Sequence, residues 1–203
     1  MIIDVHSHVW EYPRHFGDDF RRQAKRARSG TEVDLTVRYE EYRAHAREEV
    51  RTVVFGGKAR LSGMWVDDRY VADCVAKHPD TLIGFLSVDP TQAGWESEMK
   101  AGHQELGLRG IKLLSMYAGF NPSDPMLDPL WTYAQEHRLP VLLHTGTTFI
   151  AQAPLEFTLP TPGFPDCPDR SATRSPAYPT AADRSPQASG SNPAARPAKR
   201  RSS

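Results

Sequence analysis

The chain has 203 residues, no formal net charge at pH 7 and a pI of about 7.1. A chain without net charge has no strong field to attract nucleic acid or an anionic membrane, so neither partner is expected. No secretory signal opens the sequence, and no apolar run approaches the roughly 20 residues of a membrane helix. Cys74 and Cys167 are the two cysteines and lie far apart, which excludes a disulfide framework and a cysteine zinc site. We therefore expect a cytoplasmic protein.

The composition changes near residue 160. Residues 161–203 contain eight of the 17 prolines and no Leu, Ile, Val, Met or Trp. Such a segment buries too little apolar surface to offset the entropy lost on ordering. We expect residues 1–160 to form the folded domain and residues 161–203 to be a disordered tail rich in Pro, Ala, Arg and Ser.

The first 150 residues alternate short apolar runs with amphipathic stretches, which predicts βαβ units and a parallel sheet. The expected strands are 1–5, 50–55, 82–88, 108–114 and 140–145, and the expected helices are 35–49, 67–77, 91–106 and 128–137. No glycine-rich phosphate loop follows the first strand, so dinucleotide binding is not favoured. Gly56-Gly57-Lys58 lacks the spacing of a P-loop and is interpreted as a tight strand exit.

A long connection, about Val9 to Asp34, follows the first strand and is rich in Arg and Lys. These charges are typical of a solvated helix face. The alternative is a cap over an active site, since long loops at a barrel mouth carry function.

Three histidines stand at predicted strand ends. His6 and His8 are two residues apart, so they point to the same side of a strand and can bind one metal. A His-X-His pair also arises by chance, but this one lies at the carboxyl end of a strand, where barrel enzymes place catalysis. His144 ends the aliphatic run Val141–Leu143, where it is either a metal ligand or a core histidine bonded to the backbone.

Three cations are candidate substrate-binding residues. Lys112 lies within an apolar strand, and buried strands rarely carry lysine, so we expect it to face the barrel mouth and to hold a substrate carboxylate. Lys58 and Arg60 follow the second strand and could do the same, with simple solvent exposure as the alternative.

Three segments together resemble the amidohydrolase-related family. They are Met1-Ile-Ile-Asp-Val-His6-Ser-His8, Gly110-Ile-Lys112-Leu113, and Leu139-Pro-Val-Leu-Leu-His144-Thr-Gly146. The resemblance is to the branch with aminocarboxymuconate-semialdehyde and resorcylate decarboxylases, hydrolases and lactonases, and covers about residues 1–160. It implies a (β/α)₈ barrel, one divalent metal (with zinc expected) held by His6, His8 and His144, a small-molecule substrate and homo-oligomeric full-length relatives. In binuclear relatives a lysine at the position that Lys112 matches is carboxylated and bridges two metals.

The sequence departs from the family pattern after about residue 160. The family continues with a sixth-strand histidine and an eighth-strand aspartate, whereas no histidine follows His144 here. We therefore expect a truncation or a change of reading frame near Thr161, an incomplete barrel of about five parallel strands, and an inactive chain. The reaction expected of the family is metal-dependent hydrolysis of a small carboxylated or cyclic substrate. The alternatives are a metal-dependent carboxy-lyase and a non-enzymatic fragment.

Overall fold

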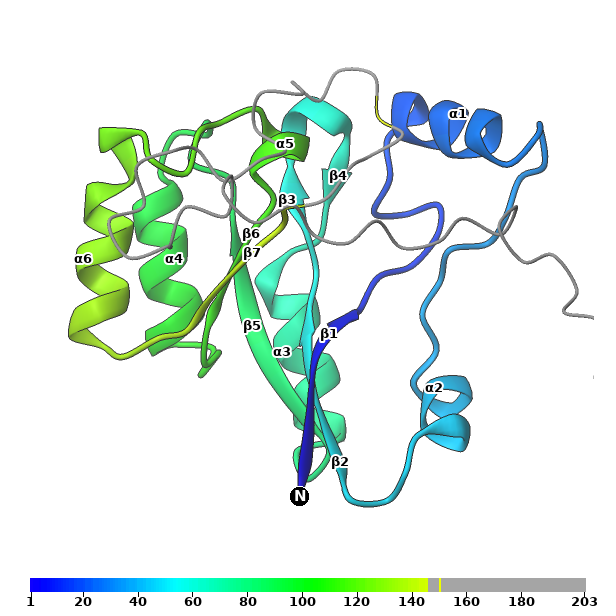
Figure 1. The fold of residues 1–203 in the computed structure, drawn as a ribbon, viewed down its shortest axis with the longest axis horizontal. Coiled ribbons are helices and arrows are strands. Elements are labelled where there is room, and N and C mark those ends of the chain that lie inside the picture. The colour runs from blue at the N-terminus through cyan, green and yellow to red at the C-terminus, as the bar shows by residue number, and fades with distance from the viewer. Residues whose placement is uncertain (146–149, 151–203) are drawn as a thin grey trace, which may run out of the picture. The chain divides into compact units, whose positions relative to one another are not determined.

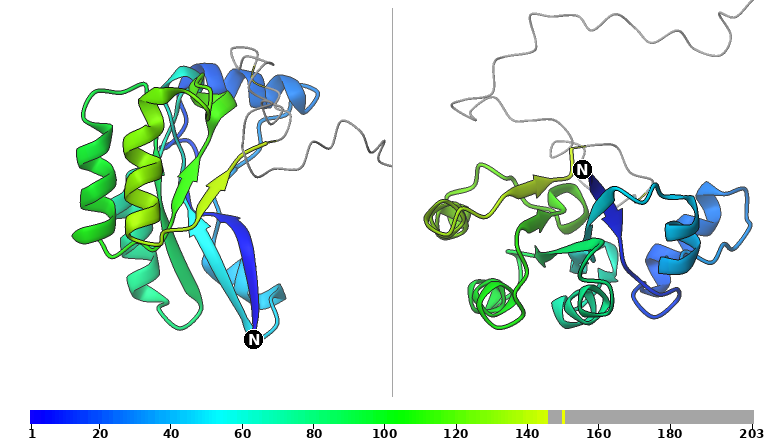
Figure 2. Two further views of the ribbon diagram at one scale, coloured as in Figure 1. Left: turned by 60° about the vertical axis from the view of Figure 1, so that its left-hand side comes forward. Right: turned by 90° about the horizontal axis from the view of Figure 1, so that it is seen from below.

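The computed structural model describes residues 1–145 and residue 150. Within them, a five-stranded parallel sheet has the order β1-β2-β5-β6-β7 and curls into a half-barrel, as Figures 1 and 2 show. The strands are β1 (Ile2–His8), β2 (Val50–Phe55), β5 (Leu82–Val88), β6 (Ile111–Leu113) and β7 (Val141–Leu143). A short antiparallel pair, β3 (Lys58–Ala59) and β4 (Met64–Trp65), follows β2. The prediction of about five parallel strands in part of a barrel is confirmed for the described residues.

Helices connect the strands and cover the outer face of the sheet (Figure 2). They are α1 (Asp18–Ala27), α2 (Tyr39–His45), α3 (Asp68–Lys77), α4 (Trp95–Gln104), α5 (Ser115–Ala118) and α6 (Asp128–Glu136), with short 3₁₀ turns at Arg60–Ser62 and Pro125–Leu127. Helix α6 starts at Asp128 with Pro129 in its first turn, where the missing N–H is not needed. Helices α3 and α4 contact the central strand β5, so the middle of the sheet is best covered.

Alternate residues of each strand point to opposite faces, which divides the apolar side chains into two clusters. The larger one lies between the sheet and the helices and includes Val54, Leu86, Ile111 and Leu113. The smaller one lies on the inner face, where Val53, Phe55 and Phe85 are buried and Ile83 and Leu142 pack against them. The inner face is therefore partly apolar and partly lined by the polar residues described below.

The second and third predicted strands, 50–55 and 82–88, have the predicted bounds, while the fourth and fifth are shorter than predicted. The predicted helices exist but are trimmed, most of all α2, which replaces the expected helix 35–49. Asp34 and Thr36 explain the late start of α2, because their side chains accept hydrogen bonds from the backbone N–H groups of Thr36 and Tyr12. Such bonds compete with the helix.

The basic connection after β1 contains helix α1, which the sequence analysis did not delimit. It buries Phe20 and Ala24 and exposes Arg22, Lys25 and Arg26. Ion pairs of the i, i+3 type link two of its arginines to aspartates in its first turn. The exposure of these side chains supports the solvated helix face, and the cap over an active site stays a hypothesis.

Two further expectations concern membrane-spanning helices and the C-terminal tail. No helix within residues 1–145 is both long and apolar enough to cross a membrane. The expected disordered tail, residues 161–203, lies outside the described residues.

Gly110, the first residue of the Gly-Ile-Lys-Leu segment, has no room for a side chain. A Cβ built there would lie 2.4–2.6 Å from atoms of the Phe85 ring, which belongs to the buried inner-face cluster. We expect Gly110→Ala to lower the free energy of unfolding by about 1–3 kcal/mol, because the ring or the strand must shift. Urea denaturation measures this change. Gly17→Ala is the control, because its Cβ would meet its nearest neighbour at 3.4 Å. An equal loss in both variants would contradict the steric explanation.

Candidate functional site

The ring of Phe55 on β2 brings the predicted site residues together. His6 and His8 on β1 lie with their ring centroids 5.2 Å and 4.6 Å from that of Phe55. The Lys112 ammonium, from β6, lies 4.6 Å from the same centroid. The two imidazoles are 5.4 Å apart. Strands β1 and β6 thus deliver polar side chains to one place on the inner face, around the apolar ring that β2 contributes.

Three polar atoms around this place are buried and lack a hydrogen-bond partner within the described residues. They are His8 Nδ1, Lys112 Nζ and His144 Nε2. Buried polar groups are almost always paired, because an unpaired one costs about 1–3 kcal/mol and a charged one costs more. Unpaired atoms on β1, on β6 and directly after β7 are therefore typical of a ligand-binding site rather than of a structural core.

Burial and mutual repulsion set the charges of these groups. Burial, followed by the charges of His6 and Lys112, lowers the pKa of His8 from 6.5 to about 3. Burial and Lys112 also lower the pKa of His6 and of His144. Burial lowers the pKa of Lys112 from 10.5 to about 8. The three imidazoles are therefore neutral near pH 7, which is the form that binds metals.

Two aromatic side chains that the sequence analysis missed complete the surroundings. The Trp10 ring stacks on the His8 imidazole at 4.1 Å, and its indole N–H donates to the Leu35 carbonyl oxygen at 2.7 Å. The Tyr117 ring meets the His144 ring edge-on at 5.1 Å. Their signal in the sequence is position alone, since Trp10 stands two residues after β1 and Tyr117 four residues after β6.

Lys58 occupies a different environment from the one expected. Its side chain is buried, and its ammonium donates to Asp68 Oδ2 at 2.7 Å and to Glu98 Oε2 at 2.9 Å, on α3 and α4. Although burial opposes its charge, the two carboxylates raise the pKa of Lys58 above its usual value. An ammonium already held by two carboxylates is a poor candidate for binding substrate, and the alternative of simple solvent exposure is wrong.

Arg60 also lies apart from the histidines in its contacts. Its guanidinium stacks 3.8 Å from the Trp65 centroid, and its backbone N–H donates to Asp89 Oδ2. The side chain remains exposed, so substrate binding by Arg60 stays a prediction.

The three imidazoles were expected to converge on one point, and the structure does not place them so. Within the described residues, no group of three His, Cys, Asp or Glu side chains is close enough to hold a metal ion as it stands. The donors nevertheless suit a divalent metal in kind, because they are neutral imidazoles with two unpaired buried nitrogens, His8 Nδ1 and His144 Nε2. The residues therefore fit a metal by chemistry, although the part of the chain that the structure describes does not gather the three imidazoles into one set of ligands.

A curled parallel sheet with polar side chains at the carboxyl ends of its strands defines a (β/α)-barrel protein. A sequence model of the amidohydrolase family matches residues 3–190. The chain belongs to the amidohydrolase family, and the match extends past residue 160, where the sequence analysis ended the resemblance. No curated protein matches the chain.

Several solved structures are similar to the chain. An amidohydrolase II structure is 13% identical, with a TM-score of 0.53, and the match covers 80% of this chain and 56% of that one. The 5-carboxyvanillate decarboxylase of Sphingomonas paucimobilis is 17% identical, with a TM-score of 0.50 and coverage of 79% and 57%. A 5-carboxyvanillate decarboxylase from Novosphingobium aromaticivorans, solved with bound manganese, is 18% identical, with a TM-score of 0.46 and coverage of 73% and 51%. The chain thus spans little more than half the length of the structures it matches.

The lowered pKa of His8 makes the stability of the metal-free chain depend on pH. The unfolded chain takes up a proton at His8 below about pH 6.5, whereas the folded chain does so only near pH 3. The free energy of unfolding should therefore fall as the pH drops through this window, by up to about 1.4 kcal/mol per unit from this group. Urea denaturation in EDTA at a series of pH values measures the slope.

His8→Gln should flatten this slope, because the group that titrates is removed. His45→Gln, at a histidine with an exposed ring, is the matched control and should leave the slope as it is. Parallel slopes for the wild type and His8→Gln would show that His8 is not buried in its neutral form.

Proposed function

We propose that this site is that of a metal-dependent hydrolase acting on a small carboxylated or cyclic substrate. The observation that carries the proposal is the group of three buried, unpaired polar atoms on one inner face: two imidazole nitrogens and one ammonium. Neutral imidazoles suit a divalent cation, and the ammonium suits an anion. A site with both kinds of group binds a metal and a carboxylate side by side.

His6, His8 and His144 would hold the metal, with zinc as the expected ion. When bound, a divalent metal supplies Lewis acidity that polarises a carbonyl or carboxylate oxygen. Lys112 would orient the substrate by donating hydrogen bonds from its ammonium to a substrate carboxylate. Its lack of any carboxylate partner within the described residues supports this role, because Lys58, the other buried lysine, has two.

The aromatic residues limit water and fix ring orientations. Phe55 is fully buried beneath His6, His8 and Lys112 and presents an apolar surface to all three. Trp10 holds the His8 ring by stacking, and its own N–H bond to Leu35 holds the indole. An environment with little water strengthens the attraction between the ammonium and a substrate anion.

A metal-dependent carboxy-lyase is the second candidate. The same arrangement of imidazoles and ammonium would orient a substrate carboxylate for loss of CO₂, followed by protonation of the carbon that carried it. The specific observation in its favour is again Lys112, since an ammonium in the site selects substrates that carry a carboxylate. Some enzymes with this fold, such as the S. paucimobilis protein, are decarboxylases.

The first experiment measures metal binding, which does not depend on turnover. Calorimetric titration of the metal-free chain with Zn²⁺ or Mn²⁺ should show binding that His6→Ala and His144→Ala each weaken. The loaded chain is then assayed against esters and lactones for hydrolysis and against aromatic carboxylates for CO₂ release. The panel that yields product identifies the reaction, provided that His6→Ala abolishes formation of that product. Metal binding that neither substitution affects would contradict the proposal.

Replacing Lys112 should separate stability from function. Lys112→Met keeps the length of the side chain but removes the unpaired buried ammonium. We expect the free energy of unfolding of the metal-free chain to rise by about 1–3 kcal/mol, because the penalty for the unpaired group is lost. Binding of a carboxylate ligand to the loaded chain should be lost at the same time.

Lys58→Met is the matched control at a paired buried lysine. It should lower stability by about 3–5 kcal/mol, because Asp68 is left buried without its counter-charge. If Lys112→Met were as destabilising as Lys58→Met, Lys112 would be a structural residue and not a binding group.

A further inference from the structure

A second pair of histidines lies on the outer face, away from the inner-face group. His103 is near the end of α4, and His137 is the residue that follows α6. Their ring centroids are 5.0 Å apart, with an interplanar angle of 65°. Two imidazoles that bind one ion at about 2.0–2.1 Å per nitrogen have ring centres roughly 5 Å apart. The centroid spacing of the pair is therefore compatible with two imidazoles on one ion.

Tyr133 holds the ring of His103 in place. Its hydroxyl lies 2.8 Å from His103 Nδ1, and its ring packs 4.2 Å from the His137 ring, centroid to centroid. In the tautomer protonated at Nδ1, His103 donates to the tyrosine oxygen and keeps the Nε2 lone pair free for a metal. Histidines that bind metals are commonly oriented in this way by a partner on the other ring nitrogen.

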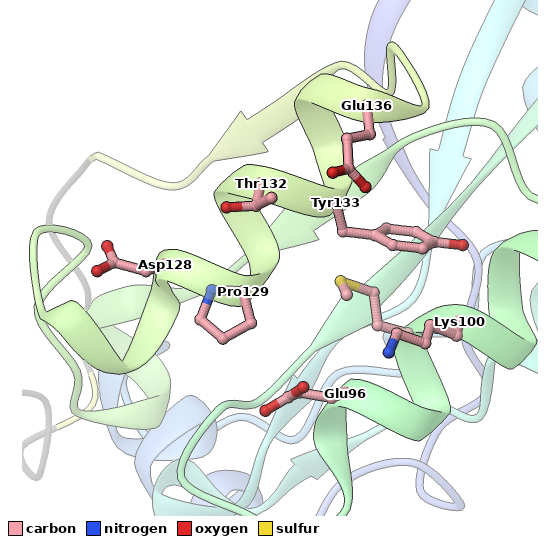
Figure 3. Close-up of a pocket in the computed structure, with 8 residues that line it drawn as sticks. Glu96, Lys100, Asp128, Pro129, Thr132, Tyr133 and Glu136 are labelled. Carbon is pink, nitrogen blue, oxygen red and sulfur yellow. The ribbon is translucent and has the colours of Figure 1, made fainter.

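The surface next to the pair favours cations. A groove of about 380 Å³ between α4 and α6 is lined by Tyr133, and it carries three carboxylates, of Glu96, Asp128 and Glu136, against one ammonium, of Lys100 (Figure 3). In Figure 3 the Tyr133 side chain reaches from α6 toward α4, so the groove and the histidine pair share this residue. Clefts lined by one sign of charge concentrate counter-ions.

We propose that His103 and His137 form a second metal site, which binds a divalent transition-metal ion such as Zn²⁺, Ni²⁺ or Cu²⁺ between α4 and α6. Imidazole is a suitable ligand for such ions, and water molecules would fill the coordination positions that the two histidines leave open. His137 is exposed and His103 is half-buried, so an ion reaches them from solvent. A bound ion links the ends of two helices and thereby stabilises the folded chain.

Zinc titration of the whole chain, followed by calorimetry and by thermal melting, tests the site. His137→Gln should remove one binding event and the associated rise in Tm, while the fold is kept because His137 is exposed. Tyr133→Phe keeps the ring but loses the hydroxyl, and it should weaken that event about 10–100-fold. His45→Gln, at another exposed histidine, should change nothing.

His144→Gln separates this proposal from that for the inner face. It should affect a different binding event, so a failure of the inner-face site would leave the effect of His137→Gln intact. The second site would be overturned if the zinc isotherm and the zinc-dependent rise in Tm of His137→Gln matched those of the wild type.

Discussion

The alternation of side chains across a parallel sheet is the constraint on which both the packing and the site depend. On β6, Ile111 and Leu113 enter the core against the helices, while Lys112 between them points to the inner face. The same alternation turns Phe55 inward and Val54 outward. Because all five strands run in one direction, their carboxyl ends meet at one end of the half-barrel. A shift of one residue in the register of a strand would move its core side chains to the inner face and its site side chains into the core.

The two buried lysines show how burial alone fails to reveal function. Lys58 and Lys112 are 4% and 0% exposed. Lys58 lies between Asp68 and Glu98, which offsets the cost of removing its charge from water, and Asp68 also accepts the backbone N–H of Ser87. It therefore ties α3, α4 and β5 together. Among the described residues, the Lys112 ammonium has no hydrogen-bond partner and lies over the face of Phe55. Burying the Lys112 ammonium without a counter-charge lowers the stability of the fold. Such a loss is expected where a bound ligand supplies the missing charge.

The sequence was sufficient where local pattern and tertiary role agree. The runs 50–55 and 82–88 are apolar and bounded by Gly or Asp-Pro, and both have the predicted limits. His6, His8 and Lys112 were found because each breaks an apolar pattern at a strand. The environment of Lys58 was misjudged, since its partners come from 10 and 40 residues away, and no local pattern reveals a pairing between a two-residue strand and two helices. The hairpin β3–β4 was missed for a similar reason: it has two residues in each strand, too few to show a period.

Electrostatics within the inner-face group also constrain what binds there. The proposed metal and Lys112 are both cations, and each disfavours the binding of the other at short range. Lys112 already lowers the pKa of His6, His8 and His144, so its field is felt by every proposed ligand. An anion between the metal and the ammonium converts this repulsion into two attractions. A substrate carboxylate is such an anion, and its binding would raise the pKa of Lys112 back from about 8 toward its usual value. A neutral substrate would leave the two cations opposed, so the arrangement favours carboxylated substrates over neutral cyclic ones.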